Sequence, residues 1–528
     1  MDAYLLELAV VATVAVGVAI VVRLFGWNMA IPLIVAGAVL SVLPVGPDAP
    51  SDPEFILMVI LAPLVFGEAL GSSYLDLRKV SRPVLALAVG LVIATTFVIG
   101  ALGSWLVAMP VAMAFALGAV LAPTDAVAVS AVARRAGLPR RVVSILEGES
   151  LVNDGTGLTA LRVALAAAAA GSVTVLEVTG VFGIAVAIGV AVGAAGGWAV
   201  TRVLRWSNDL IASNALMLVL PFLLYPLAER LEGSGILAVV VAGLVIAHVQ
   251  HSDPGYSERV QGAVVWRHIT FLLQALAFFM IGMEIPDVFR RLPSGQLQAV
   301  LILIPTVLVA LIVTRALFVF AMTSMGRVRS GTVARFPLAP TVVLSWAAAR
   351  GPVSGLAAFS IPVYFDDGSR VPFRDVILAT TFGIIVITLL LSLTLAPLAR
   401  WLHLRSDDDA TEVNRIDAAL ARAAIDRLSA LESEAEAQGD PLPPEVSQRL
   451  RDDAERRILE SSRRGDTTTT RELVTTRLWS TAREMVRAEQ EELLRLQDEE
   501  GLPDSLVRPI MTQLDLRDQS LQSRRGPG

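Results

Sequence analysis

Long apolar stretches alternate with short polar connections from residue 3 to residue 400, and this pattern predicts membrane-spanning helices. A helix needs about 20 apolar residues to cross the hydrocarbon core of a bilayer, and stretches of that length recur through this part of the chain. We expect thirteen spans, near residues 3–22, 28–43, 55–71, 83–107, 111–133, 141–168, 179–203, 210–228, 235–249, 264–285, 296–322, 337–360 and 375–400. Spans two and three are short and contain Pro32 and Pro63, so we expect them to be tilted or broken.

The pattern changes after residue 404. Residues 405–528 are rich in charge, and their apolar side chains recur three and four positions apart, as in "RIDAALARAAIDRLSAL" (415–431). This spacing predicts amphipathic helices, which "GDPLPPEV" (439–446) should interrupt. We therefore expect a membrane domain over residues 1–404 and a charged helical tail over residues 405–528. The tail either supports dimerisation and stability or regulates the membrane domain.

The basic residues between the predicted spans give an orientation. If the N-terminus lies outside, the inner connections hold most of the arginines and lysines of the first 400 residues. Such an excess marks the cytoplasmic side of a membrane protein. We expect a multi-pass protein of the plasma (inner) membrane, with its N-terminus outside and its tail in the cytoplasm.

Composition excludes several classes of protein. Of the 528 residues, 54% are hydrophobic and 17% are charged, and the net charge of −6 gives no basic surface for nucleic acid. The chain has no cysteine, which excludes disulfides, thiolate metal sites and thiol nucleophiles. Its four histidines are scattered without metal-ligand spacing. The first residues lack the features of a removable signal peptide and are read as the first span.

Charged side chains are almost absent from the middle of the predicted spans, so the exceptions are informative. An ionised group near the middle of a bilayer costs about 2.5–3.5 kcal/mol or more. Arg350, a visiting cation or a proton can balance the buried carboxylates. We expect Arg162 and Arg315 to lie at the membrane surface or to face lipid, with their guanidinium groups reaching the headgroups. The exceptions are Glu68, Asp125, Glu149, Asp154, Arg162, Glu284, Arg315 and Arg350.

Two spans contain sequence that breaks a helix near its middle. Pro123 precedes Asp125 in span five, and Gly351 and Pro352 follow Arg350 in span twelve. Proline removes a backbone donor and clashes with the preceding turn. The freed carbonyl groups and half-helix ends can then coordinate an ion. Because the breaks lie seven spans apart, we expect spans 1–6 and 8–13 to form two inverted six-helix repeats.

The most polar stretch within the spans is "ILEGESLVNDGTGL", residues 145–158. In a helix Glu149 and Asn153 share one face, and Ser150 and Asp154 share the adjacent face. The alternative is a turn at "NDGTG", which is strong turn sequence. A turn here would leave pieces too short to span a bilayer and would upset the distribution of charge between loops. The pattern therefore favours a continuous helix.

Four segments resemble the monovalent cation:proton antiporter-1 family, the bacterial and animal sodium/proton exchangers. They are "LAPLVFGEAL" (61–70), "APTDAVAVSAV" (122–132), "ILEGESLVNDGTGL" (145–158) and "SWAAARGPVSGLAA" (345–358). The resemblance covers about residues 1–400 in the family's order and spacing, and leaves the tail outside. It implies an all-α polytopic protein with thirteen transmembrane helices, crossed broken helices and a homodimer with an elevator-like core. It implies a transporter and not an enzyme, with no cofactor beyond the transported ions.

The resemblance also implies roles for individual residues. Asp154 would carry cation and proton in turn. Glu149 would pair with Arg350, and Asn153 would fix the helix arrangement. One departure is "WAAARG", where many members have glycines before the arginine. The implied cation-binding set is Thr124 (through its carbonyl), Asp125, Ser150 and Asp154, with Glu68 nearby.

Each of these roles has a structural alternative. Asp154 can be a structural carboxylate, and Asp125 can cap the helix break. The hydroxyl of Ser150 can bond to its own helix. Glu68 can be a satisfied polar group of the bundle instead of part of the access path. Glu149 and Arg350 can take part in transport directly.

Elementary chemistry points to the same carrier. Arginine does not release its proton at any relevant pH, so Arg350 cannot shuttle protons, and Asn153 cannot titrate. Asp154 is left as the acid with reason to exchange a proton for a cation. Hard oxygen ligands favour sodium or lithium over softer metals. One carboxylate with one occupant at a time predicts electroneutral one-for-one Na⁺/H⁺ exchange by alternating access, which would regulate intracellular pH and Na⁺.

Three rival functions use the same features. A cation channel also places acids beside broken helices, and a potassium/proton exchanger would differ only in the cation carried. An intramembrane aspartyl protease would pair Asp125 with Asp154, but such enzymes place the aspartate after a Gly-x-Gly and "NDGTG" has it before the glycines. His248, His251 and His268 gather around one inner loop and can sense pH or have no such role.

Overall fold

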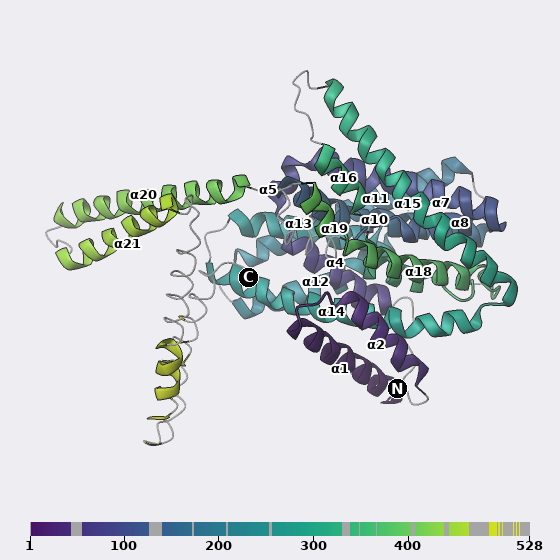
Figure 1. Cartoon of the computed structure of the whole chain (residues 1–528), viewed down its shortest axis with the longest axis horizontal. Coiled ribbons are helices and arrows are strands. Elements are labelled where there is room, and N and C mark those ends of the chain that lie inside the picture. Colours follow the sequence, from purple (N-terminus) through teal and green to yellow (C-terminus); the bar gives the residue numbers. More distant parts are fainter. Residues whose placement is uncertain are drawn as a thin grey trace. The chain divides into compact units, whose positions relative to one another are not determined.

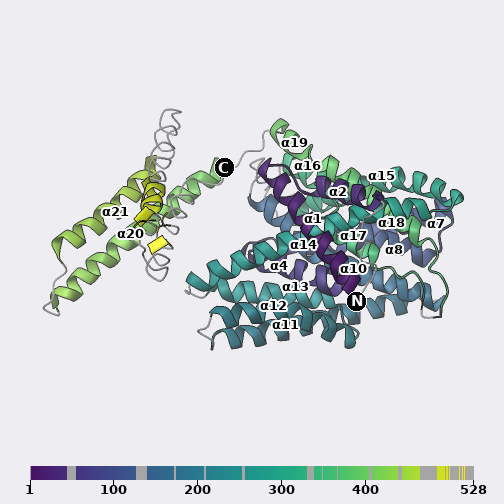
Figure 2. The same ribbon diagram turned by 90° about the horizontal axis from the view of Figure 1, so that it is seen from below.

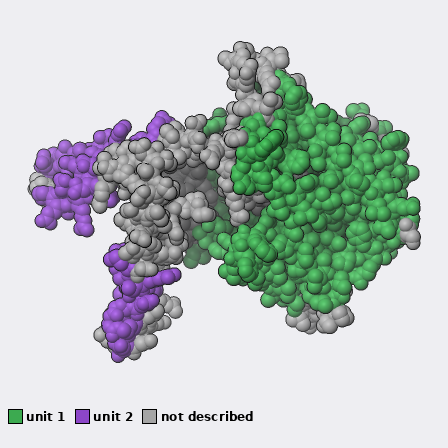
Figure 3. Space-filling view, viewed as in Figure 1, with its two compact units in different colours: residues 1–406 green, residues 407–528 purple. Residues whose placement is uncertain are grey.

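Helices account for nearly all of the described chain in this computed structural model (Figure 1). The chain divides into two compact units, unit 1 at residues 1–406 and unit 2 at residues 407–528 (Figure 3). The structure describes residues 2–43, 55–125, 140–171, 174–206, 210–252, 256–329, 338–347, 349–365, 367–402, 407–437, 443–463, 485–493 and single positions between 495 and 517.

Unit 1 contains α-helices and two π-helical turns, labelled η. Their bounds are α1 Asp2–Leu24, α2 Ala30–Val42, η1 Ile56–Leu61, α4 Ala62–Gly71, α5 Tyr74–Lys79, α6 Ser81–Leu85, η2 Ala86–Leu91, α7 Val92–Val107, α8 Val111–Leu121, α10 Arg140–Ala170, α11 Val175–Leu204, α12 Leu210–Arg230, α13 Gly235–Ser252, α14 Tyr256–Arg291, α15 Ser294–Arg329, α16 Leu338–Trp346, α17 Pro352–Phe359, α18 Arg374–Ser392 and α19 Leu395–Trp401.

Within the described residues, six helical stretches are long and apolar enough to cross a bilayer. They are residues 81–107, 176–204, 211–230, 264–291, 295–324 and 374–401. Five shorter apolar helices accompany them, at residues 9–24, 30–42, 56–71, 111–121 and 235–249. The prediction of a helical protein that crosses the membrane several times is confirmed. The count of thirteen spans and the inverted repeats stay predictions.

Two of the predicted spans contain a π-helical turn next to a proline. η1 precedes Pro63, which lies in the first turn of α4, and η2 follows Pro83. A π-turn is a common cause of a bend in an otherwise α-helical segment. Pro32 lies in the first turn of α2, where its missing N–H costs no helical hydrogen bond, and α2 continues unbroken to Val42.

The polar stretch at residues 145–158 lies inside one continuous helix, α10, of 31 residues. The prediction of a helix is confirmed, and a turn at "NDGTG" is wrong. Its glycines serve close packing instead. A Cβ on Gly157 would come within 2.4 Å of the Pro123 ring, and one on Gly155 would come within 3.2 Å of Leu237. Contacts with α8, α13, α16 and α17 place α10 in the interior of unit 1.

Helices α11, α12 and α13 lie side by side along one edge of unit 1 (Figure 2). α11 approaches α13 through glycines spaced four residues apart. A Cβ on Gly189, Gly193 or Gly197 would come within 2.7, 2.3 or 3.0 Å of a backbone oxygen of Ser234 or α13. Small residues at this spacing allow helix backbones to pack closely where no hydrophobic effect drives them together.

Unit 2 contains the predicted amphipathic helices, α20 Asp407–Ala437 and α21 Pro444–Arg463. They pack against each other, with an ion pair of 2.7 Å between Arg451 of α21 and Glu432 of α20. The predicted interruption at 439–446 lies partly outside the described residues, and α21 begins within it.

Candidate functional site

Two unwound segments, each after the end of a helix, meet inside unit 1. α8 ends at Leu121, and residues 123–125 are non-helical; α16 ends at Trp346, and α17 begins at Pro352. The backbone N–H of Asp125 donates to the carbonyl of Ala349 over 2.9 Å, so the two unwound segments bond to each other. The predicted break in span twelve is confirmed, and α8 ends where a break was predicted in span five. The rest of span five, after residue 125, lies outside the described residues.

Each interrupted helix has an arginine at its carboxyl end. The Arg350 Nε donates to the carbonyl of Leu121, the last residue of α8, over 2.9 Å. The Arg315 Nε donates to the carbonyl of Leu344, near the end of α16, over 2.8 Å. The last carbonyls of a helix lack partners within it and carry partial negative charge. Two arginines therefore supply hydrogen bonds to helix-end carbonyl groups that lipid could not supply.

Glu149 is held by Arg315. The Arg315 Nη1 and Nη2 reach the two carboxylate oxygens of Glu149 at 2.5 and 2.8 Å, and the side chains are only 2% and 1% exposed. The predicted pairing of Glu149 with Arg350 is therefore wrong, and so is the expectation that Arg315 faces lipid or the membrane surface. The planar guanidinium of Arg315 matches the carboxylate with two parallel bonds, while Arg350 reaches across to α8.

Thr124 and Asn153 extend this pair into a chain of hydrogen bonds. The Thr124 hydroxyl donates to Glu149 Oε1 over 3.1 Å, and Asn153 Nδ2 donates to that hydroxyl over 2.9 Å. The chain joins α10 to the unwound segment after α8. The Thr124 hydroxyl is thus engaged in two hydrogen bonds. The predicted role of Thr124 was to bind the cation through its carbonyl and not through this hydroxyl.

A small cavity lies where the interrupted helices meet α10. The volume that the centre of a water molecule can occupy in it is about 10 Å³. This is roughly the volume needed for one water molecule. All five residues of the predicted cation-binding set line it together. The lining residues are Glu68, Pro123, Thr124, Asp125, Ser150, Asp154, Gly351, Val353 and Ser354.

The acids around the cavity differ in their surroundings. Asp154 is 3% exposed, and no described residue donates a hydrogen bond to it. Glu68 is half-buried and accepts a long bond of 3.4 Å from Gln274. Asp125 lies against Gly351, where a Cβ would come within 2.3 Å of its Oδ2. Asp154 is thus the buried acid that a proton or a cation must stabilise.

Comparison with known proteins identifies the class of protein. A family model described as "Sodium/hydrogen exchanger, transmembrane" matches residues 10–401. The chain belongs to the sodium/hydrogen exchanger family. Members of this family are transporters and not enzymes, which confirms the predicted family and excludes the aspartyl protease.

The chain is similar to other exchangers and antiporters in sequence and in fold. The chain is 32% identical to an uncharacterised Na⁺/H⁺ exchanger of Mycobacterium bovis, over 85% of this chain and 83% of the relative. It is 33% identical to a sodium, potassium, lithium and rubidium/H⁺ antiporter of Bacillus pumilus, over 70% of this chain and 57% of the relative. The fold is similar to that of the sodium proton antiporter MjNhaP1 from Methanocaldococcus jannaschii, with a TM-score of 0.60 and 18% identity, over 76% of this chain and 98% of that one.

Two other charged residues of the predicted spans, one half-buried and one buried, lie outside the cavity. Arg162 donates to the Tyr225 hydroxyl over 2.7 Å and pairs with Glu229, so it bonds to α12 from α10. We predicted that the guanidinium of Arg162 would reach the lipid headgroups. It instead contacts two side chains of α12. Glu284 faces Arg291 at 3.4 Å near the end of α14.

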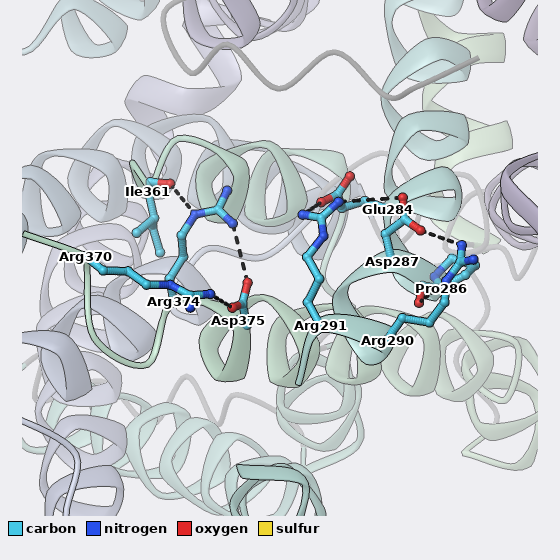
Figure 4. A network of polar contacts seen from close by, with 9 residues as sticks. All are labelled: Glu284, Pro286, Asp287, Arg290, Arg291, Ile361, Arg370, Arg374 and Asp375. Carbon is cyan, nitrogen blue, oxygen red and sulfur yellow. Dashed lines mark hydrogen bonds and ion pairs between the residues drawn. The ribbon is translucent and has the colours of Figure 1, made fainter. Parts of the chain in front are cut away.

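Glu284 is part of a second polar network (Figure 4). On α14, Asp287 accepts from Arg290 at 2.5 Å. Near the start of α18, Arg370 lies 2.9 Å from Asp375, and Arg374 Nε donates to the carbonyl of Ile361 over 2.8 Å. The contacts of Arg370 and Arg374 stabilise the chain between α17 and α18, and none of the residues of the network lines the cavity.

Sequence reasoning placed one residue of the site wrongly, Arg315, and missed another, Ser354. Arg315 lies within a long apolar helix, and its position near mid-span was itself a sign of a buried partner. Ser354 lines the cavity from α17, but a serine in a membrane helix usually bonds to its own backbone. No spacing or composition signal distinguished Ser354 from other serines.

Proposed function

We propose that this exchanger moves one Na⁺ against one H⁺ by alternating access, with the two ions competing for Asp154. The observation that carries the proposal is the position of Asp154, buried beside a cavity the size of one water and without a hydrogen bond from any described residue. Such a carboxyl needs a proton or a cation to remain in a dry interior. A protonated carboxyl has no charge to hold a cation, and a bound cation disfavours protonation, so loading with either ion opposes loading with the other.

The cation would be held by hard oxygen donors. The Asp154 carboxylate, the Ser150 hydroxyl, the Asp125 carboxylate and the Thr124 carbonyl belong to residues that line the cavity. Oxygen ligands of this kind suit alkali cations. The Ser150 hydroxyl makes no bond to its own helix among the described residues, which favours a ligand over the structural alternative. Glu68 would line the path by which ions reach the cavity.

The other charges at the site would stay fixed during transport. Arg315 holds Glu149 with two bonds, and Arg350 holds the end of α8. Arginine keeps its proton, and Asn153 has none to exchange. With one carrier that alternates between a proton and a monovalent cation, each cycle would move no net charge.

Na⁺ is the proposed main substrate, with Li⁺ and K⁺ as further cations. The printed name of the Bacillus pumilus relative includes sodium, potassium, lithium and rubidium, which supports a site that accepts several alkali cations. Potassium/proton exchange is the second candidate function for the same reason.

The proposal also includes the membrane topology and the assembly of the protein. Thirteen spans in two inverted repeats with crossed broken helices are supported by a helix within each of the thirteen predicted segments and by the bond between Asp125 and Ala349. The excess of arginine and lysine in alternate loops supports an outside N-terminus and a cytoplasmic tail in the inner membrane. We propose a homodimer that regulates intracellular pH and Na⁺.

Proton movement in vesicles tests the function. Purified protein is reconstituted with a pH-sensitive dye inside, and NaCl, LiCl, KCl or choline chloride is added outside. The wild type should move protons with Na⁺ and not with choline, and Asp154→Asn should abolish the response. Asp76→Asn, on the exposed helix α5, is the matched control and should behave as wild type. Normal exchange by Asp154→Asn contradicts the proposal.

A further inference from the structure

Ser354 stands out among the hydroxyl-bearing residues near the cavity. It is 1% exposed, lies in the first turn of α17 and lines the cavity with Asp154 and Ser150. Hydroxyls on the neighbouring parts of the chain bond to their own helix: Ser360, which follows α17, to the carbonyl of Ala357 over 2.7 Å, and Thr388 and Ser392 in the same way on α18. Within the described part of the chain, the Ser354 hydroxyl has no hydrogen-bond partner, although burial of such a group is costly.

The electrostatics of α17 make a cation acceptable beside Ser354. A helix N-terminus carries partial positive charge, which would repel a cation. Here the first residue is Pro352, which has no N–H. The Asp125 carboxylate lies against Gly351, the residue before it. Together they offset the positive end of the helix, and α17 presents a hydroxyl oxygen to the cavity.

We propose that Ser354 is a cation-binding residue of the exchanger, whose hydroxyl coordinates the transported alkali cation together with Asp154. The inference rests on the proposed function and extends its ligand set to the second interrupted helix. A hydroxyl has two lone pairs and one proton. It can therefore direct a lone pair to the cation in one half of the cycle and accept a hydrogen bond from the protonated Asp154 carboxyl in the other.

Under this proposal the cation would contact residues from both unwound segments. Asp154 and Ser150 lie on α10, Asp125 follows α8, and Ser354 lies on α17. A bound cation would join these elements across the cavity. Hydrogen bonds or ligand contacts to a charged group are stronger than neutral ones, so removal of the hydroxyl should weaken cation binding measurably.

The test measures Na⁺ binding as a rise in the melting temperature of the purified full-length protein, because a ligand that binds only the folded state stabilises it. NaCl is compared with choline chloride at equal ionic strength. In Ser354→Ala the concentration of Na⁺ that gives half of the rise should increase about tenfold. Ser360→Ala, at the residue that follows α17, is the control and should leave this concentration unchanged.

A second variant covers the case in which Ser354→Ala does not fold. Ser354→Cys keeps nearly the same shape but replaces a hard oxygen with a soft sulfur, and it should weaken Na⁺ binding similarly. An unchanged half-saturating concentration of Na⁺ in either folded variant overturns the role of Ser354. If the wild type itself shows no Na⁺-driven proton movement in vesicles, the proposed function fails instead, so the two failures are distinguishable.

Discussion

Removal of the Arg315 side chain should be among the most damaging changes in unit 1. Arg315→Gln takes both bonds from the carboxylate of Glu149 and one from the carbonyl of Leu344. Loss of one partner of a buried ion pair costs about 3–5 kcal/mol, because the other charge stays buried and unpaired. Arg350→Gln removes a bond to Leu121 but leaves this ion pair intact.

A double-mutant cycle isolates the pair. Glu149→Gln and Arg315→Gln should each destabilise the protein by about 3–5 kcal/mol, and the double variant by less than the sum, because no uncompensated charge remains. We expect a coupling free energy of about 2–3 kcal/mol, within the range for residues in direct contact. The same cycle with Arg350→Gln in place of Arg315→Gln should give a smaller coupling.

Thermal melting of purified protein, followed by tryptophan fluorescence, measures these differences. With an unfolding entropy of about 2.1 cal/mol/K per residue, a loss of 4 kcal/mol over about 400 residues lowers the melting temperature by about 5 °C. All variants are scanned at one heating rate. Arg290→Gln, at an exposed ion pair, should change little. A coupling of Glu149 to Arg350 as large as that to Arg315 would refute the assignment.

Two further predictions concern a close contact and a loop. Gly351→Ala should abolish exchange in vesicles, because its Cβ would overlap Asp125 by more than a flexible side chain can absorb, whereas Gly180→Ala, with open space around it, should retain exchange. In the loop before α18, hydrogen bonds from the hydroxyl and amide of Ser369 lower the pKa of Asp367 below its usual 3.8. The stabilisation that the ionised Asp367 gives the loop is present above pH 3.8 and is lost as the pH falls through the lowered pKa. Ser369→Ala removes the hydroxyl bond and brings the pKa of Asp367 closer to 3.8, so the loop should lose this stabilisation at a higher pH. Proteolysis of the loop as a function of pH measures the change.

Hydropathy over stretches as long as a membrane span was sufficient to predict most of the helices of unit 1. α10 could be predicted because a turn at "NDGTG" conflicts with the length of a span, although the local sequence favours a turn. The close approach of Pro123 and Leu237 to its glycines was not predictable, since it depends on neighbours distant in sequence.

The choice of partner for Glu149 could not be read from the sequence. Arg315 and Arg350 are both buried arginines, and both bond to the end of an interrupted helix. Only the placement of α15 beside α16 decides which guanidinium reaches the carboxylate. The set around Asp154 was predicted from the family resemblance, and the shared helix face of Ser150 and Asp154 is consistent with it. The contribution of Ser354 required the three-dimensional arrangement.

The central claim is that a proton and an alkali cation replace each other at Asp154, and the count of protons released on Na⁺ binding tests it most directly. Na⁺ is titrated into weakly buffered purified protein, and proton release is compared with Na⁺ bound. On the acidic side of the range in which Na⁺ affinity depends on pH, the wild type should release close to one proton per Na⁺ bound, and Asp154→Asn should release none. Na⁺ binding without proton release, or equal release by Asp154→Asn, would contradict the account.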